Sequence, residues 1–402
     1  MKNGFDLYNY KKKIEKAILR LSESNISERN KTLIFEFVDH CKLENLSKAR
    51  IERYYGVLRD WALLIKNDFD KADKKEIMKA VSILQDNDDF KMWTKITYKS
   101  MLKRFYKWLN DDIEYPDSVK WISTRMKTTD KEVHSAGDLI TEEEIKQAIH
   151  SAKHPRDKAF ISILYESGAR IGEIGSLQIK NVSFDKYGIM IDVMGKTGHR
   201  AIRLISSTPH VMTWINSHPN KDDRESPLWI NIGNTNFGKI MQYQAMAKIL
   251  RNNFTRAGIK KKFNPHFFRH SRASFLADHL TEFQMNQYFG WIQGSDMPST
   301  YVHMNGRKIE DSLLALNGIH KLEEKEDSVL KPKICVKCDF INDCESKFCS
   351  KCGGALDVKT SCELNEVSEK RIKSDDLMNL LLKDKNIASL MVQKIKEMGL
   401  NC

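Results

Sequence analysis

The chain has 402 residues and carries 66 lysines and arginines against 54 aspartates and glutamates, a formal net charge of +12. This surplus is compatible with a polyanionic partner, although on so long a chain it also serves solubility. Hydrophobic residues make up 41% of the chain, charged residues 30%, and there are only 8 prolines. That composition is typical of a helix-rich globular protein and argues against a disordered or fibrous one.

No stretch approaches the roughly 18 consecutive apolar residues that a membrane span needs, and the first residues do not lead into an apolar signal core. Neither membrane insertion nor secretion is therefore expected. Eight cysteines are few for this length, and four of them form two C-x-x-C pairs. Such pairs favour a metal site in a reducing compartment over disulfides, so the expected location is the cytoplasm.

Residues 1–112 are predicted to form a helical domain. Between residues 27 and 109 apolar residues recur at helical spacing, which predicts four helices, the clearest over 46–66 and 94–109. Basic residues lie between the apolar positions of the latter helix: Lys95, Lys99, Lys103, Arg104 and Lys107. We expect them to form either a DNA-binding face or an ordinary solvated face, because the sequence does not decide between the two.

A linker is predicted over 113–138, since this segment contains Pro116 and shows no sustained period. A second domain is predicted over 139–320. Thr141 and Glu144 form a capping-box pattern that opens a helix, and alternating residues on both sides of the turn at 195–198 predict a β-hairpin. Residues 242–316 are predicted to be helical again.

Four separated segments of this second domain contain residues suited to phosphate chemistry. The first places Arg170 and Glu173 after a glycine, and the second places Lys196 in the hairpin turn. The third has His266, Arg269 and His270 at helical spacing, and the fourth contains Tyr301. Each segment alone is common enough by chance to carry little weight, and Lys196 and Arg200 alone would pass as ordinary polar residues of a hairpin.

In this order and at these distances the segments resemble the tyrosine recombinase (phage integrase) family. The matching positions are Arg170 with Glu173, Lys196, His266 with Arg269, Trp291 and Tyr301. The resemblance covers residues 139–316 and, less distinctly, the N-terminal helices, which are similar to the family's core-binding (SAM-like) domain. It implies a mainly α protein with an α+β catalytic domain that contains a small antiparallel sheet.

The resemblance also implies a function. The protein would be a site-specific DNA recombinase or integrase that cleaves and rejoins strands through a 3′-phosphotyrosyl intermediate on Tyr301. Its partner would be double-stranded DNA, on which it would assemble as a dimer to tetramer, and catalysis would need no cofactor. Two alternatives remain open: a type IB topoisomerase, which uses a similar set of residues, and a DNA-binding accessory factor without activity.

The chemistry of the residues agrees with this family. A phosphodiester attacked by a tyrosine gains negative charge on its non-bridging oxygens, and the guanidinium groups of Arg170 and Arg269 are suited to neutralise it. The resemblance makes Lys196 the general acid for the leaving 5′ oxygen. Glu173 would orient the site. His270 is expected either to support catalysis or to be a core histidine.

Two features depart from the family pattern. Trp291 occupies the position where most members have a histidine, which retains an N–H donor but removes a titratable group. The interval from Trp291 to Tyr301 is one residue longer than usual. The sequence therefore leaves open whether the helix with the tyrosine docks in cis or on a neighbouring protomer.

A zinc ribbon is predicted over 331–358, because two C-x-x-C pairs at this spacing offer four thiolates to one Zn²⁺: Cys335, Cys338, Cys349 and Cys352. The site would be structural, since thiolates fill all four positions, and so small a module would need the metal to fold. Residues 366–402 are predicted to form an amphipathic helical tail that packs either on its own catalytic domain or on a neighbouring protomer.

Overall fold

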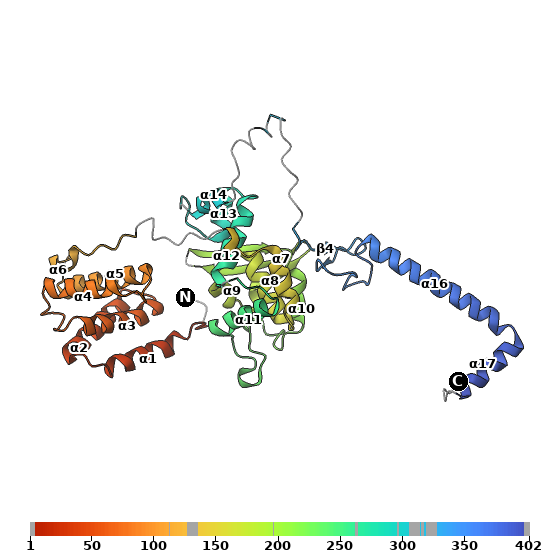
Figure 1. Cartoon of the computed structure of the whole chain (residues 1–402), viewed down its shortest axis with the longest axis horizontal. Coiled ribbons are helices and arrows are strands. Elements are labelled where there is room, and N and C mark those ends of the chain that lie inside the picture. The colour runs from red at the N-terminus through yellow and green to blue at the C-terminus, as the bar shows by residue number, and fades with distance from the viewer. Residues whose placement is uncertain are drawn as a thin grey trace. The chain divides into compact units, whose positions relative to one another are not determined.

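The computed structural model describes residues 5–111, 113–126, 136–195, 197–261, 264–295, 297–304, 314, 317–318 and 328–397. The chain divides into an N-terminal unit, Met1–Gly137 with Gln242–Gln244, and a C-terminal unit, Asp138–Met241 with Ala245–Cys402. Figure 1 shows the elements of both units in chain order. Within the part of the chain that is described, no helix is long and apolar enough to cross a membrane.

The N-terminal unit is entirely helical. Its elements are α1 (Tyr10–Ser22), α2 (Glu28–Leu43), α3 (Lys48–Leu64), α4 (Lys74–Asp86), α5 (Met92–Leu109) and α6 (Asp117–Lys120). The side chains of Ser27 and Asp73 accept backbone N–H bonds at the starts of α2 and α4, which fixes where these helices begin. The four helices predicted between residues 27 and 109 are confirmed; α1, which packs on α3, is an additional helix.

Part of the predicted linker belongs to this unit. Val119 and Ile122 are buried in the same core as Phe37, Trp61 and Phe105. The Nζ of Lys103 on α5 donates to the carbonyls of Lys120 and Ile122, at 3.4 and 3.1 Å. Residues 119–122 of the predicted linker therefore pack with the helices of the N-terminal unit.

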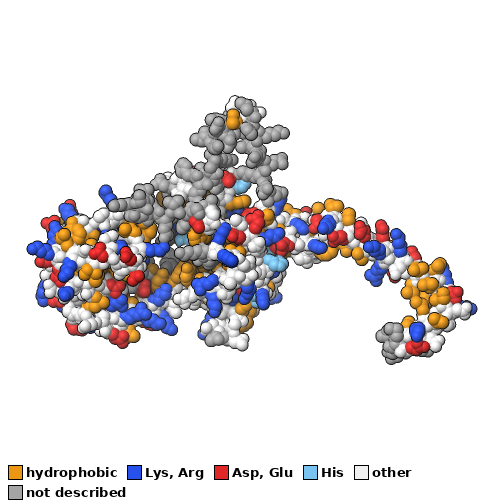
Figure 2. Space-filling view, in the orientation of Figure 1, with side chains coloured by type: hydrophobic (Ala, Val, Ile, Leu, Met, Phe, Trp, Pro, Cys, Tyr) orange, Lys and Arg blue, Asp and Glu red, His pale blue; other side chains and the backbone are white. Residues whose placement is uncertain are grey.

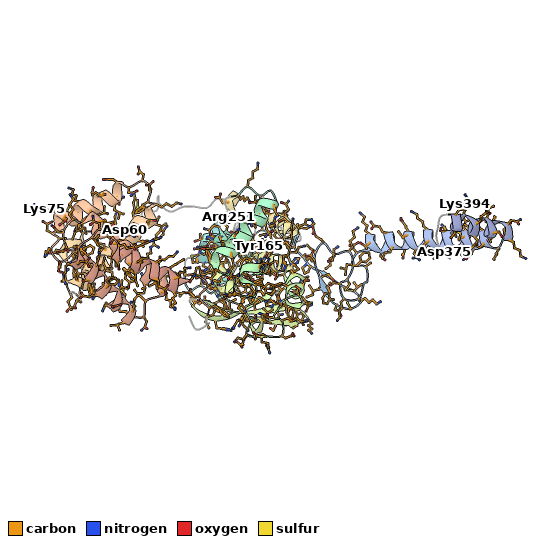
Figure 3. The ribbon with its side chains drawn as sticks, turned by 90° about the horizontal axis from the view of Figure 1, so that it is seen from below. Asp60, Lys75, Tyr165, Arg251, Asp375 and Lys394 are labelled. Atoms are coloured by element: carbon orange, nitrogen blue, oxygen red, sulfur yellow. The ribbon has the colours of Figure 1, made fainter. Side chains whose placement is uncertain are left out.

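The C-terminal unit combines helices with one small sheet. Its helices up to residue 304 are α7 (Glu142–Ser151), α8 (Pro155–Ser167), α9 (Ile171–Gly175), α10 (Thr208–Asn216), α11 (Tyr243–Arg256), α12 (Pro265–Ala277), α13 (Glu282–Phe289) and α14 (Met297–Met304), with short 3-10 turns η3 (Ile179–Asn181) and η4 (Asn234–Asn236). A further 3-10 turn, η2 (Ala136–Asp138), spans the boundary between the two units along the chain. The capping box of Thr141 and Glu144 is present at the start of α7. Helix α8 packs against α7, α10 and α12 (Figure 1), and Tyr165 on α8 lies among densely packed side chains (Figure 3).

The sheet contains strands β1 (Val182–Asp185), β2 (Gly188–Gly195) and β3 (Gly198–Leu204), antiparallel and in that order. Gly195 pairs with Gly198, so the β2–β3 hairpin closes through a two-residue turn. Gly198 has a φ of 112°, which favours glycine there. The predicted hairpin is confirmed, and β1 extends it by one strand.

One buried carboxylate joins α8 to the end of the sheet. Glu166, near the end of α8, accepts hydrogen bonds from the backbone N–H groups of Ile205, Ser206 and Ser207 at 2.7 to 2.9 Å. It also accepts a bond from the hydroxyl of Ser207, the N-cap residue of α10. A carboxylate at this position satisfies N–H groups that would otherwise be unpaired where α10 begins.

The segment predicted to be a zinc ribbon contains a two-stranded sheet of β4 (Lys333–Ile334) and β5 (Ile341–Asn342). It contacts α10 of the same unit, since Nε2 of His210 lies 2.8 Å from a carboxylate oxygen of Asp343. Ion pairs also join Glu345 to Lys146 and to His150, each at 3.4 Å.

Two helices follow the ribbon, α16 (Val358–Leu382) and α17 (Lys385–Glu397). Helix α16 begins earlier than the tail predicted from residue 366, because Asp357 caps its first turn. Leu377, Leu380 and Leu390 are exposed, and hydrophobic side chains are visible along both helices (Figure 2).

Candidate active site

Arg170 is placed by a glycine turn at the end of α8. Gly168 has a φ of 54°, and a Cβ at this position would come within 2.6 Å of the Phe289 ring. The chain turns here and α9 begins with Arg170 as its N-cap. Glu173 accepts bonds from the backbone N–H and the Nη1 of Arg170, at 2.9 and 3.0 Å. The Arg170 side chain is still 32% exposed, so its guanidinium can reach a bound anion.

Arg269, the second predicted arginine, is held more rigidly. It lies on α12, is 4% exposed, and donates from Nη1 to the carbonyl of Gly168 at 3.1 Å and from Nη2 to the carbonyl of Phe289 at 2.7 Å. Its Cζ is 5.3 Å from the centre of the Trp291 ring. Burial, together with the nearby Arg170, lowers the pKa of Arg269 to about 10, so the guanidinium is still charged at neutral pH.

Tyr301 docks on its own chain. It is 2% exposed, and its hydroxyl oxygen lies 2.6 Å from Nδ1 of His270. Its ring is parallel to that of Trp291, with 5.6 Å between centres and 4° between planes. Burial raises the pKa of Tyr301 to about 12, against the opposing effect of Arg269. A base and nearby positive charge are therefore needed to form a phenolate here.

His266 and His270 lie on one face of α12, with 5.8 Å between ring centres. His266 keeps an exposed surface, but partial desolvation and the guanidinium groups of Arg269 and Arg170 lower the pKa of its imidazole, which favours the neutral form at pH 7. His270, for which the sequence left a core role open, makes the direct contact with Tyr301.

Trp291 links the arginine to the tyrosine. Its ring stacks on Phe289, with 4.7 Å between centres, and on Tyr301. The preceding Gly290 has a φ of 62° and ends α13. The indole therefore supports both groups by packing, and the extra residue before Tyr301 does not prevent docking in cis.

Lys196 lies outside the described residues, but its neighbours are described. The hydroxyl of Thr197 donates to the carbonyl of Gly290 at 3.0 Å. Arg200, two residues after the turn-closing Gly198, donates to Glu173 at 2.8 Å and to the carbonyl of Tyr288 at 3.0 Å. No role of Arg200 in the site is predicted from the sequence, because both of its partners are distant along the chain.

The two other tyrosines considered from the sequence are engaged or buried. The hydroxyl of Tyr288 donates to the carbonyl of Glu166 at 2.8 Å, and burial raises the pKa of Tyr288 to about 12. Tyr165 is buried, which raises its pKa strongly.

The basic residues of α5 make internal contacts. Lys95 is buried and its Nζ donates to the carbonyl of Gln85, so the expectation that it lies on an outer face is wrong. Lys99 donates to the side chain of Gln85. Lys103 and Lys107 lie over the ring of Tyr115, at 4.5 and 5.7 Å.

Arg104, also on α5, pairs with Glu44. The helical periodicity predicted the wrong environment for Lys95 because α5 packs against α2, α3, α4 and α6. These contacts bury part of the face that was expected to meet solvent.

The four predicted zinc ligands converge. The Sγ atoms of Cys335, Cys338, Cys349 and Cys352 all lie within 4.8 Å of one another, and two of the pairs are 3.6 Å apart. A tetrahedral zinc with bonds of about 2.3 Å places its sulfurs about 3.8 Å apart. The residues therefore fit a Zn²⁺ ion.

Comparisons with known proteins match the region of this site to a known family. Residues 138–307 match the phage integrase family model. The tyrosine recombinase XerD of Oceanobacillus iheyensis is 24% identical over 297 residues, which cover 69% of this chain and 95% of that protein.

Two solved structures share the fold. The site-specific recombinase XerH bound to difH DNA has a TM-score of 0.56 at 16% identity, over 79% of this chain and 92% of that one. A lambda integrase dimer bound to a core site has a TM-score of 0.53 at 13% identity, over 73% and 80%. Arg170, Glu173, His266, Arg269, Trp291 and Tyr301 lie together within the region 138–307 that matches the phage integrase family, and the chain is similar to tyrosine recombinases, which are DNA breaking-rejoining enzymes.

Proposed function

We propose that the protein is a site-specific DNA recombinase in which Tyr301 is the nucleophile. The observation that carries this proposal is the placement of the Tyr301 hydroxyl, 2.6 Å from His270 and on the same Trp291 ring that faces Arg269. A nucleophile, a base and a guanidinium are thus supplied by one protomer.

The proposed cleavage step can be followed atom by atom. The Tyr301 oxygen forms a bond to phosphorus while the bond from phosphorus to the 5′ oxygen breaks. His270 is positioned to take the phenol proton. Arg170 and Arg269 neutralise the charge that develops on the non-bridging oxygens, and Lys196 protonates the departing 5′ oxygen. His266, which is neutral, is available to donate a hydrogen bond to the same phosphate.

Trapping on DNA tests this assignment. A duplex nicked close to the cleavage site loses the short strand that would reverse the reaction, so the covalent adduct accumulates. Tyr301→Phe should bind this duplex normally and form no adduct. Tyr288→Phe is the control, since its hydroxyl is bonded to a backbone carbonyl, and it should still form the adduct. An adduct that survives in Tyr301→Phe and disappears in Tyr288→Phe would overturn the assignment.

The accessory-factor alternative is disfavoured by the same geometry, because a protein without activity has no need of a buried tyrosine held by a histidine. The topoisomerase alternative shares that geometry and differs in assembly. We propose double-stranded DNA as the partner and a dimer to tetramer on DNA, in line with the lambda integrase dimer on its core site. Exchange of strands between two duplexes requires several protomers.

The domains have separate proposed tasks. Residues 1–112, extended by the packed segment to 122, form a core-binding domain on which Lys99, Lys103, Arg104 and Lys107 contact DNA phosphates. Lys95 instead stabilises the fold of this domain through its bond to the carbonyl of Gln85. Residues 139–320 are catalytic. The ribbon holds a structural Zn²⁺ through its four thiolates, which favours the reducing cytoplasm as the location.

A further inference from the structure

We propose that Arg200 is a positioning residue for the cleavage reaction. Arg200 attaches the β2–β3 hairpin, which contains Lys196 in its turn, to Glu173 and to the segment that precedes Trp291. This inference rests on the proposed function, because it assigns a task to the general acid of that reaction. Arg200 itself lies 27 residues from one partner and 88 from the other along the chain.

Every nitrogen of the Arg200 guanidinium is engaged. Its Nη2 and Nη1 donate to the two carboxylate oxygens of Glu173, at 2.8 and 3.4 Å, and its Nε donates to the carbonyl of Tyr288 at 3.0 Å. The two side chains are 11% and 6% exposed. A guanidinium is suited to this site because its planar fork can bind a carboxylate with two nitrogens and a carbonyl with the third.

Glycines on both sides make room for this group. A Cβ at Gly195, directly before Lys196, would lie 2.6 Å from Oε1 of Glu173 and 3.0 Å from Nη1 of Arg200. A Cβ at Gly290, directly before Trp291, would lie 3.0 Å from the same Nη1 and 3.2 Å from the hydroxyl of Thr197. The turn end of the hairpin and the Trp291 segment are therefore packed around Arg200 with no space for another side chain.

The charge balance gives Arg200 a second effect. Burial alone would raise the pKa of Glu173, but Arg200 and then Arg170 lower it below its ordinary value. Without Arg200, Arg170 would be the cation left to pair with the buried Glu173 carboxylate among these contacts. The hairpin would also lose two of its links, to Glu173 and to Tyr288, and keep the Thr197 bond to Gly290.

A change of leaving group separates the effect on Lys196 from the effect on Arg170. In a duplex whose scissile 5′ oxygen is replaced by sulfur, attack by Tyr301 forms the same phosphotyrosyl bond and breaks a P–S bond. The thiolate leaves without a proton, so the general acid is no longer needed. A defect that arises from a displaced Lys196 is corrected by this substrate. A defect in folding, or in the binding of the phosphate by Arg170 and Arg269 (the phosphate clamp), persists.

The variant to measure is Arg200→Ala in the full chain. On ordinary nicked DNA its adduct should form about a hundredfold more slowly, the scale expected when a reacting group is misplaced by about 1 Å. On the sulfur-substituted duplex its rate should return close to that of the wild type, as should that of Lys196→Ala. Arg200→Lys, which keeps the charge but not the fork, should retain most of the defect on ordinary DNA.

Two further variants keep the test decisive. Arg203→Ala is the matched control, since Arg203 lies on the same strand and pairs with Asp185 at the surface; it should leave both rates unchanged. Thr197→Val removes one hairpin contact without changing a charge. It should show the same rescue on the sulfur-substituted duplex, and it replaces Arg200→Ala in the test if that variant does not fold.

Three outcomes would overturn the proposal. They are an equal defect of Arg200→Ala on both substrates, a normal rate on ordinary DNA, and a Thr197→Val defect without rescue. A wild-type protein that forms no adduct on either substrate would instead refute the proposed function, and with it this inference.

Discussion

The two arginines of the phosphate clamp should respond differently to the same substitution. Arg269→Lys and Arg170→Lys both keep a positive charge, and both remove the planar fork that matches two phosphate oxygens. Each should therefore slow adduct formation by about a hundredfold or more. Their effects on stability should differ, because the structure buries one side chain and leaves the other partly exposed.

The size of that difference follows from the contacts. Arg269 donates to two buried carbonyls, of Gly168 and Phe289, and its guanidinium lies over two aromatic rings. An ammonium group can keep at most part of this arrangement, and an unpaired buried carbonyl costs about 1 to 3 kcal/mol. With some loss of ring contact, Arg269→Lys should lower the free energy of unfolding by about 2 to 3 kcal/mol.

For Arg170→Lys the corresponding loss should be within about 0.5 kcal/mol, because the side chain is partly in solvent and makes one salt bridge. Thermal melting of the full-length variants, read together with adduct formation on nicked DNA, measures both quantities. The melting temperature of Arg269→Lys should fall by about 5 to 10 °C. Equal melting temperatures for the two variants, or near-normal cleavage by both, would refute the reasoning.

Three other outcomes are expected. The pKa of His266 is lowered, so its ring gains a charge only at a pH below the ordinary histidine range; His266→Gln, which keeps a neutral N–H donor, should therefore retain most of the single-turnover rate at neutral pH, and a loss as large as that of His266→Ala would contradict this. EDTA or Cys349→Ser should unfold the ribbon and leave strand cleavage largely intact, with about one zinc per untreated chain by metal analysis; a zinc-free native chain with paired half-cystines would contradict this. Light scattering should find two to four protomers on cognate DNA, whereas one protomer per duplex on every sequence tried, with efficient plasmid relaxation, would favour the topoisomerase.

The parts of the site predicted from the sequence are those whose signals are local. Helical spacing alone places His266, Arg269 and His270 on one face, and Arg170 follows a glycine that ends a helix; the resemblance to the family is what predicted that these two segments act together. Tyr301 could be selected by its position in the family pattern. Its docking in cis could not, because that depends on how the Trp291 ring packs between Phe289 and Tyr301.

Arg200 and Lys95 show the limits of sequence patterns. The role of Arg200 depends on Glu173 and on the carbonyl of Tyr288, which approach it only in the folded chain. Lys95 occupies a polar position of an amphipathic helix, yet other helices of the unit cover it and its Nζ reaches the carbonyl of Gln85. In both cases a long side chain found a backbone partner that no periodicity specifies.

The last turn of α8, with the glycine that follows it, holds three other segments of the unit by hydrogen bonds. Within three residues it supplies the Glu166 carboxylate that holds the start of α10, the Glu166 carbonyl that holds Tyr288, and the Gly168 carbonyl that holds Arg269. An insertion or deletion in α8 would rotate all three hydrogen-bonding groups at once, although neither Glu166 nor Gly168 is proposed to touch DNA. Random mutagenesis for altered target choice should therefore find almost no tolerated changes in this turn, while the exposed helices after the ribbon accept many.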